Sequence, residues 1–365
     1  MQSTLPRIFG RFVLIDRLAK GGMGEIFVAA PRVANGRSKL CAVKTILRGR
    51  SRDFAQRFRE EGALLTSMRH PNVVDVFEMG RVGLEHYMAM EMVVGQDASR
   101  LLRRGHRLQR LLPPAGALWI IHQLLAALAY CHRHTDECGS ALGVIHRDVS
   151  PGNVLVSYDG YVKLADFGLA YSARKITRTA PDVVLGKMGY MAPERLLGAP
   201  TDQRADIFAA GVLLFELLTG VRFAPSRMAN EFLRMAARRA HHVPSMLRPA
   251  LPQAVDRLVQ RAVAMDPDQR FSSAEAFQEA LCGVLAAIDP TYGARQLAEE
   301  VMAPWFHEDP VLARLDKLIA RHSLDGQWLE ATREWQPSSS GRSHTQGKNW
   351  ADTQTEVDLL DPSAR

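Results

Sequence analysis

Cysteine is scarce in this sequence, and the cysteines that occur are far apart. Only four are found among 365 residues: Cys41, Cys131, Cys138 and Cys282. They form no C-x-x-C pair and do not have the Cys/His spacing of a zinc site, so we expect neither a disulfide-stapled small domain nor a structural zinc. Reduced thiols in a cytosolic protein are the interpretation that fits.

Long apolar runs and a leader segment are also missing. No uninterrupted apolar run reaches the roughly 18 residues that a membrane helix needs. The first ten residues have neither the apolar stretch nor the cleavage site of a secretory signal. We therefore expect a soluble, cytoplasmic protein without a transmembrane segment, which reaches a membrane only through a partner.

Lysine is rare as well, because only 8 of the 46 basic residues are lysine and the other 38 are arginine. With 39 acidic residues the net charge is only +7. Several arginines gather at Arg100, Arg103, Arg104, Arg107 and Arg110. A basic cluster of this kind is one feature of nucleic-acid binding, but a solvated helical face that binds acidic partners is the better interpretation, and no nucleic-acid partner is expected.

The residues that are present indicate a globular chain of two or three folding units, at roughly 150 residues per unit. Residues 8–46 alternate between apolar and polar as antiparallel strands do, with a hairpin at Asn35-Gly36. Helical spacing over 53–69 and strands over 73–79 and 86–93 follow. Beyond Gly95 helices dominate, notably over 115–134, 205–219 and 256–285, with short strands near 154–157 and 162–165. The pattern predicts an α+β protein with a small β-rich lobe and a larger α-helical lobe.

These changes of pattern define the expected organisation of the chain. We predict an N-terminal extension (1–9), an N-lobe (10–94), a C-lobe (95–286), a partly helical extension (287–335) and a disordered tail (336–365). The tail is rich in Ser, Thr, Asp and Gly and has too few apolar groups to offset the entropy of ordering. Trp305, Trp328 and Trp335 either pack onto the larger lobe or help the tail to recruit a partner.

A glycine-rich turn between two predicted strands is the first stretch that indicates chemistry. Residues 19–26 read Ala-Lys-Gly-Gly-Met-Gly-Glu-Ile, and glycines let a backbone approach phosphate oxygens closely. Alone this is a weak signal, because Ala19 replaces the first glycine of a G-x-G-x-x-G pattern. Lys44 follows on an apolar strand, where an ammonium group needs a charged partner. Glu60 or Glu61, one helix further on, can supply it.

The strongest signal is an ordered series of short motifs. His146-Arg147-Asp148 is followed by Asn153, then by Asp166-Phe167-Gly168 and by Met191-Ala192-Pro193-Glu194. This order and spacing match the catalytic loop, the metal-binding loop and the Ala-Pro-Glu motif of protein kinases. Over residues 10–286 the chain therefore resembles the eukaryotic-like (Hanks-type) bacterial serine/threonine protein kinases with an HRDVSP-type catalytic loop. The resemblance implies the bilobal protein kinase fold and ATP-dependent transfer of phosphate to Ser or Thr of protein substrates in intracellular signalling.

The resemblance also implies an ATP site. In this family the glycine loop covers the phosphates, Met90 is the gatekeeper, and the backbone of Glu91 and Val93 contacts adenine. Asp97 either contacts the ribose or is an ordinary helix cap. The implied ATP-binding residues are Gly21, Gly22, Met23, Gly24, Ile26, Ala42, Lys44, Met90, Glu91, Val93, Asp97 and Leu155.

Four catalytic or metal-binding roles are carried over in the same way. Lys44 holds the α and β phosphates and pairs with Glu61, which lies nine residues before His70 as in the family, whereas Glu60 is interpreted as a solvated neighbour. Asp148 is the catalytic base. Asn153 and Asp166 supply oxygen ligands for Mg²⁺, with Mn²⁺ as a substitute.

Two further parts of the family pattern predict structural anchors. Asp206 matches the buried aspartate that holds the backbone of the catalytic loop. Arg270 matches the arginine that pairs with Glu194. Neither residue is expected to contact the substrate.

The sequence departs from the family beside the catalytic base. Most serine/threonine kinases have a lysine two residues after the catalytic aspartate, and here that residue is Ser150. Lys187 stands where the family has a threonine, just before Ala-Pro-Glu. Our hypothesis is that Lys187 supplies the cation that Ser150 lacks. The alternative is that Lys187 contacts only substrate or solvent and the enzyme is weak.

The departures leave competing functions open. A nucleotide-binding pseudokinase or scaffold with weak transfer is the main alternative, but degenerate kinases usually lose one of the four catalytic groups that are present here. A small-molecule kinase is less favoured because the Ala-Pro-Glu segment is intact. Autophosphorylation is expected at Thr177 or Thr179, and less so at Ser172, where a phosphate can pair with Arg147.

Overall fold

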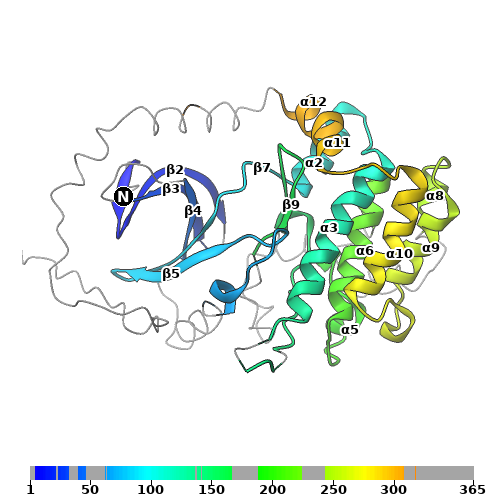
Figure 1. The fold of residues 1–365 in the computed structure, drawn as a ribbon, viewed down its shortest axis with the longest axis horizontal. Helices are drawn as coiled ribbons and strands as arrows, with labels where there is room; N and C mark the ends of the chain where they lie inside the picture. Colours follow the sequence, from blue (N-terminus) through cyan, green and yellow to red (C-terminus); the bar gives the residue numbers. More distant parts are fainter. Residues whose placement is uncertain are drawn as a thin grey trace, which may run out of the picture. The chain divides into compact units, whose positions relative to one another are not determined.

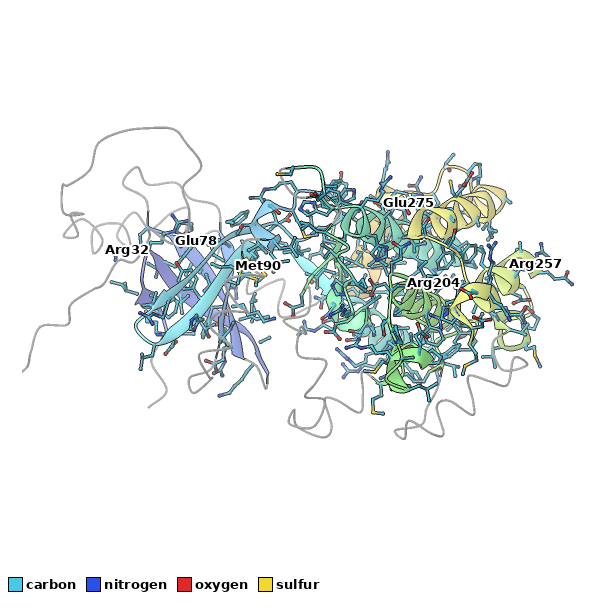
Figure 2. All side chains as sticks on the ribbon, turned by 90° about the horizontal axis from the view of Figure 1, so that it is seen from below. Arg32, Glu78, Met90, Arg204, Arg257 and Glu275 are labelled. Carbon is cyan, nitrogen blue, oxygen red and sulfur yellow. The ribbon has the colours of Figure 1, made fainter. Side chains whose placement is uncertain are left out.

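The computed structural model describes residues 5–21, 24–32, 40–46, 62, 64–135, 138–140, 142–166, 188–223, 243–307 and 317. The chain divides into two compact units. Unit 1 comprises Met1–Ser67, Val76–Met92 and Ala313–Arg365, and unit 2 comprises Met68–Asp75 and Val93–Leu312. Strands dominate the described part of unit 1 and helices that of unit 2 (Figure 1). Glu78 and Met90 lie on strands of unit 1, and Glu275 lies on a helix of unit 2 (Figure 2).

Unit 1 is built on a six-stranded antiparallel sheet in the order β1-β2-β3-β4-β6-β5. Its strands are β1 (Arg7–Phe9), β2 (Phe12–Gly21), β3 (Gly24–Pro31), β4 (Cys41–Ile46), β5 (Val76–Val82) and β6 (Glu85–Glu91). Alternate residues of β3, β4 and β6 are buried in one apolar cluster. The rings of Phe9 and Phe12 meet Tyr87 edge to face, with centroids 5.6 and 5.7 Å apart. The predicted alternation over 8–46 is therefore confirmed, while the predicted hairpin at Asn35-Gly36 lies outside the described residues.

The predicted strand over 73–79 begins later than expected. Val73 instead forms an isolated parallel bridge with Leu164, and the Val74 N–H donates to the Leu164 carbonyl at 2.9 Å. Both residues thus belong to unit 2, and β5 starts at Val76. Backbone pairing with a strand far along the chain overrides the local apolar pattern here.

Unit 2 is organised around buried helices. Its longer helices are α2 (Ala98–Leu108), α3 (Pro114–His132), α6 (Arg204–Thr219), α9 (Gln253–Ala262) and α10 (Ala274–Ile288), and its short ones include η1 (Pro151–Asn153), α5 (Pro193–Leu196), α8 (Pro244–Leu247) and η4 (Pro267–Gln269). Every residue of α6 after Arg204 is buried, as expected for a helix that is apolar on all sides. Helix α3 packs against both α6 and α10. A three-stranded antiparallel sheet, β7 (Gly95–Asp97), β8 (Val154–Ser157) and β9 (Val162–Leu164), completes the unit.

Helix α3 bears on the expectation that the chain has no transmembrane segment. Within the described part of the chain this 19-residue helix is long and apolar enough, by length and composition, to cross a membrane. Its most apolar window is 67% buried inside unit 2. A single such helix is weak evidence for a membrane span, because the core helix of a globular protein meets the same criteria.

The segment after α10 packs back onto unit 2. It contains α11 (Ala294–Leu297), a π-helical turn η5 (Ala298–Met302) and α12 (Ala303–Phe306), next to α2 in Figure 1. The Trp305 side chain is buried, and its carbonyl accepts a hydrogen bond of 2.6 Å from Arg104 Nε on α2. Gly160 has a φ of +79°, and a Cβ there would lie 1.8 Å from the Ala294 carbonyl oxygen. Trp305 thus packs on the helical unit, whereas Trp328 and Trp335 lie outside the described residues.

Candidate active site

The sheet of unit 1 places four predicted ATP-binding residues on one face. Lys44 stands opposite Ile26 on β3, and Ala42 stands opposite Met90 on β6. Residues directly opposite in antiparallel strands share a face, as do residues two apart in one strand. This face of the sheet is opposite to the one that packs in the apolar cluster of unit 1. Lys44 is half-buried there, with Val43 and Thr45 buried on either side of it.

The glycine turn connects β2 to β3 at the end of this sheet. Gly21 and Gly24 are register partners in the two strands. A Cβ at position 24 would lie only 1.8 Å from the Thr45 carbonyl oxygen, so the close approach of β4 requires glycine there. This structural reason for Gly24 is additional to the predicted contact with phosphate. Gly22 and Met23, at the tip, lie outside the described residues.

The predicted adenine and ribose residues follow along the chain. Met90 is buried and Glu91 ends β6, with Val93 two residues further on. Asp97 caps α2, because its Oδ1 accepts hydrogen bonds from the Arg100 N–H at 2.8 Å and from Ser99 Oγ at 2.5 Å. Asp97 also pairs with Leu155 across β7 and β8. The helix-cap role of Asp97 is therefore observed, and the ribose contact stays a prediction.

The catalytic loop of unit 2 is anchored by Asp206 of α6. Its carboxylate accepts hydrogen bonds from the backbone N–H groups of His146 and Arg147, both at 2.8 Å, and lies 2.9 Å from His132 Nε2. Burial by itself would raise the pKa of Asp206, but the contacts with His132, His146 and the Arg147 N–H lower it below its usual value. An ionised Asp206 thus holds the loop, as the sequence predicted. The contribution of His132 was not predicted, since no motif marks it within α3.

Asp148, Asn153 and Asp166 are brought together within unit 2. Asn153 Nδ2 donates to both the carbonyl and the Oδ2 of Asp148, at 2.7 and 2.8 Å. The Asn153 carbonyl accepts a hydrogen bond of 2.8 Å from the Ala165 N–H. Asp166, the residue after Ala165, therefore lies near Asn153. Asp166 has a φ of +53°, in the left-handed region that is uncommon for non-glycine residues.

This donor set fits a hard divalent cation. Mg²⁺ takes oxygen ligands and is usually held by one or two protein groups together with substrate phosphates. The amide of Asn153 directs its nitrogen to Asp148, so its oxygen is the atom left for a metal, and Asp166 adds a carboxylate. The described residues contain no group of three His, Cys, Asp or Glu that could hold an ion by themselves.

Ser150 is buried at the position where the family has lysine. Ser150 is only 4% exposed, and its Oγ has no hydrogen-bond partner among the residues that the structure describes. A buried neutral hydroxyl does not supply a positive charge. The roles predicted for six other residues stay predictions, because these residues lie outside the described part of the chain: Glu60, Glu61, Lys187, Ser172, Thr177 and Thr179.

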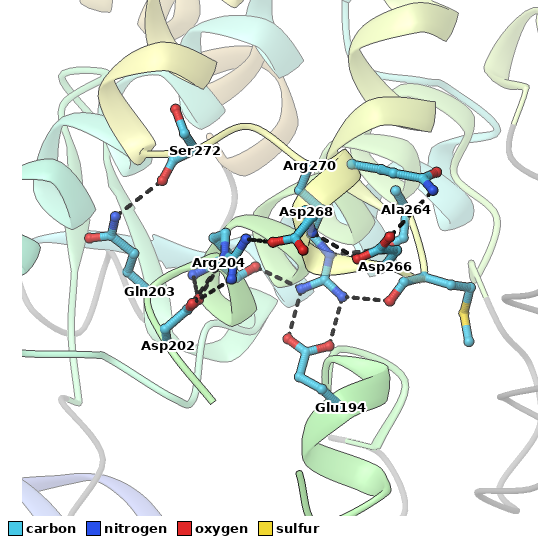
Figure 3. Close-up of polar contacts among 11 residues, drawn as sticks. Glu194, Asp202, Gln203, Arg204, Ala264, Asp266, Asp268, Arg270 and Ser272 are labelled. Carbon is cyan, nitrogen blue, oxygen red and sulfur yellow. Dashed lines mark hydrogen bonds and ion pairs between the residues drawn. The ribbon is translucent and has the colours of Figure 1, made fainter. Parts of the chain in front are cut away.

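The predicted ion pair between Glu194 and Arg270 is confirmed. The guanidinium group donates to both carboxylate oxygens, at 2.8 and 2.7 Å (Figure 3). The Arg270 side chain is fully buried and also donates to the carbonyls of Ala264, Arg204 and Met265. Arg204, the first residue of α6, forms a second set of ion pairs with Asp202 and Asp268. Of these contacts, the Glu194–Arg270 pair holds α5 in the helical unit.

The strand-rich and helical units, with a catalytic loop and a metal-binding loop in this order, define a protein kinase. The model of the protein kinase domain family matches residues 12–282, and the chain belongs to this family. The predicted bilobal α+β kinase fold is confirmed by a solved structure. The crystal structure of the Mycobacterium tuberculosis PknI kinase domain covers 77% of this chain and 99% of its own, with a TM-score of 0.57 and 26% identity.

Curated relatives place the chain among the bacterial kinases. It is 38% identical over 294 residues to the tyrosine-protein kinase MasK of Myxococcus xanthus, covering 77% of this chain and 45% of MasK. It is 35% identical over 286 residues to the serine/threonine-protein kinase PksC of Streptomyces coelicolor, covering 76% and 50%. For the serine/threonine-protein kinase PrkC of Bacillus subtilis the identity is 31% over 275 residues, covering 74% and 40%. The chain thus spans half or less of the length of these relatives.

Proposed function

We propose that this chain is an active kinase that transfers the γ-phosphate of ATP to Ser or Thr hydroxyls of proteins. The observation that carries the proposal is the preorganised Asp148, whose carboxylate accepts from Asn153 and whose loop is anchored by Asp206. Preorganised groups of this kind are what phosphoryl transfer requires of a protein. Lys44, Asn153 and Asp166 complete the set of catalytic groups.

The proposed reaction follows from the chemistry of these side chains. The acceptor hydroxyl oxygen forms a bond to the γ-phosphorus while the bond from that phosphorus to the bridging oxygen of ADP breaks. Asp148 accepts the hydroxyl proton, and Lys44 pairs with the α and β phosphates. Asn153 and Asp166 hold Mg²⁺, which neutralises phosphate charge when it is bound.

The acceptor class is proposed from the relatives. PksC and PrkC are named serine/threonine kinases, whereas MasK is named a tyrosine kinase. Two of these three names therefore favour Ser and Thr, and phosphoamino-acid analysis of the product separates the classes. Protein substrates in cytoplasmic signalling, and a docking role for the C-terminal tail, belong to the same proposal.

Incubation of the chain with labelled ATP, Mg²⁺ and a casein or histone acceptor tests the proposal. Asp148→Asn should reduce transfer at least a hundredfold, because it removes the base, while nucleotide binding persists. Asp159→Asn, an exposed aspartate in the same unit, is the matched control and should transfer normally. Nucleotide binding by the wild type without transfer above that of Asp148→Asn would instead establish the scaffold alternative.

The same assay decides the role proposed for Lys187. If Lys187 supplies the cation that Ser150 lacks, Lys187→Met should lower kcat strongly, and adding Ser150→Lys should restore it. A kcat of Lys187→Met within about twofold of wild type would reject this role, since a lost charge contact in the transition state costs about 3 kcal/mol.

Mass mapping of the same samples tests autophosphorylation. The proposal requires that phosphate is found at residues 169–186.

A further inference from the structure

Arg195 follows Glu194 in α5 and contacts the catalytic loop. Helix α5 is held in place by the buried ion pair between Glu194 and Arg270. From this anchored helix the guanidinium of Arg195 donates through Nη1 to the carbonyl oxygen of Arg147. A short, anchored helix therefore carries a cation to the residue that directly precedes Asp148.

The two peptide groups on either side of the Arg147 Cα are thereby each held by a charged side chain. Asp206 accepts from the Arg147 N–H at 2.8 Å, and Arg195 donates to the Arg147 carbonyl. Arg147 has a φ of +63°, so the chain bends sharply there in a conformation that costs a non-glycine residue of order 1 kcal/mol. Backbone strain of this kind persists only where surrounding contacts hold it. Arg195 supplies one of these contacts.

Carboxylates of the catalytic loop and of α6 act on the charge of Arg195. Arg195 is half-buried, and burial lowers its pKa. The negative charges of Asp148 and Asp206 act in the opposite direction, which places Arg195 within electrostatic reach of both carboxylates. Partial burial strengthens such interactions relative to water. An arginine stays protonated even so, because its unperturbed pKa is above about 12.

We propose that Arg195 is a positioning residue for Asp148: it fixes the peptide that leads into the catalytic base and keeps a positive charge beside it, where Ser150 provides none. The proposal rests on the proposed kinase function. It differs from the role proposed for Lys187, because Arg195 acts through Asp148 and its backbone, whereas Lys187 would contact the phosphate itself. The buried Ser150 side chain is neutral and adds no charge to this loop.

Steady-state kinetics of Arg195 variants test the proposal. Arg195→Met should lower kcat about 10- to 100-fold with the KM for ATP changed less than about threefold, since Asp148 acts in the chemical step and not in nucleotide binding. Arg195→Lys, which keeps the charge and one donor, should recover at least a third of the lost activity. Thermal unfolding of each variant shows that the assays are run on folded protein.

Arg248→Met is the matched control. Arg248 is also half-buried, and its guanidinium donates to two carbonyls of unit 2, those of Leu112 at 2.8 Å and Leu218 at 3.1 Å. Its loss should lower the unfolding midpoint by a similar amount but leave kcat within twofold. A similar kcat for Arg195→Met and Arg248→Met would overturn the proposal. So would an Arg195→Lys variant as inactive as Arg195→Met.

A milder variant keeps the test decisive if Arg195→Met does not fold. Arg195→Gln retains a side-chain donor without the charge, and it should lie between wild type and the methionine variant in kcat. Wild-type kcat in folded Arg195→Gln would reject the electrostatic part of the proposal. The proposed kinase function fails separately, if the wild type shows no transfer above Asp148→Asn.

Discussion

His146 shows how a single side chain of the catalytic loop depends on its protonation state. The ring is buried, its Nδ1 accepts from the Asp148 N–H at 3.3 Å, and its Nε2 lies 3.2 Å from the Ala165 carbonyl. This pair of contacts requires a neutral ring that donates from Nε2 and accepts at Nδ1. Burial lowers the pKa of His146 accordingly. The histidine thus connects Asp148 to the strand end that precedes Asp166.

A pH dependence of stability follows from the lowered pKa of His146. Below the unfolded pKa of about 6.5 the unfolded chain binds a proton that the folded chain does not, so the free energy of unfolding falls as the pH falls. Between pH 7.5 and 5.5 this residue should account for up to about 1.4 kcal/mol of the loss. His146→Phe should remove that part of the pH dependence in urea-unfolding experiments.

The exposed His106 of α2 supplies the control for this prediction. His106→Gln should leave the pH dependence of the wild type unchanged. If the phenylalanine variant is too unstable to measure, the imidazole resonances of wild-type protein give the answer directly. A His146 ring that titrates near pH 6.5 in the folded protein would contradict the prediction.

Helix α5 illustrates how a four-residue element is held by contacts outside itself. A helix this short has almost no stability of its own, because nucleation costs more than a single turn returns. Glu194 binds Arg270 on one side of α5, while Arg195 contacts the catalytic loop on the other. The element therefore connects the buried salt bridge to the residue that precedes Asp148.

Breaking the Glu194–Arg270 pair should destabilise the protein strongly. Glu194→Gln leaves the fully buried Arg270 guanidinium without its counter-charge, which should cost about 3–5 kcal/mol in the free energy of unfolding. A double-mutant cycle with Arg270→Met should show a coupling well above 0.5 kcal/mol, as contacting residues do. Arg295→Ala, which removes an exposed ion pair with Glu299, should leave the unfolding midpoint unchanged. Equal effects at the two pairs would refute this account.

The kinase fold of this chain extends beyond the residues that the family model matches. That match ends at 282, whereas apolar side chains up to Phe306 are buried. The Phe306 ring meets Tyr158 edge to face at 6.5 Å, and Tyr292 donates to Glu300 at 3.1 Å. Residues 289–307 thus cover α2 and the turn between β8 and β9, and they form part of the core of unit 2.

Removing Trp305 should therefore weaken unit 2 as a whole. Trp305→Ala deletes a large side chain that is only 2% exposed, and a loss of about 3–5 kcal/mol in the free energy of unfolding is expected. Tyr161→Ala, which truncates an aromatic side chain of the same unit that is 63% exposed, should change the free energy by less than about 0.5 kcal/mol. Indistinguishable unfolding midpoints for the two variants would show that the extension is not part of the folded unit.

Much of the fold and of the candidate site could be predicted from linear patterns. Alternating apolar residues placed β1 to β4, and long apolar helical patterns placed α3 and α6. The motif around Asp148 and the one at Asp166 are defined by order and spacing along the chain, so they can be identified without any contact. Val73, in contrast, has the apolar character of a strand residue in β5 but pairs with Leu164, because hydrogen bonding to a distant partner outweighs local preference.

The order of residues alone therefore established the family and the fold class, and it predicts the catalytic groups, because these depend on spacing within short segments. The tertiary structure decided which other groups meet: His132 with Asp206, 74 residues away, and Arg195 with Arg147, 48 residues away. No local pattern encodes such pairs, since they form only after helices distant in sequence pack around a common core. For the same reason the sequence shows only that Ser150 replaces a charged lysine of the family. The contact of Arg195 with the catalytic loop is seen only in the folded chain.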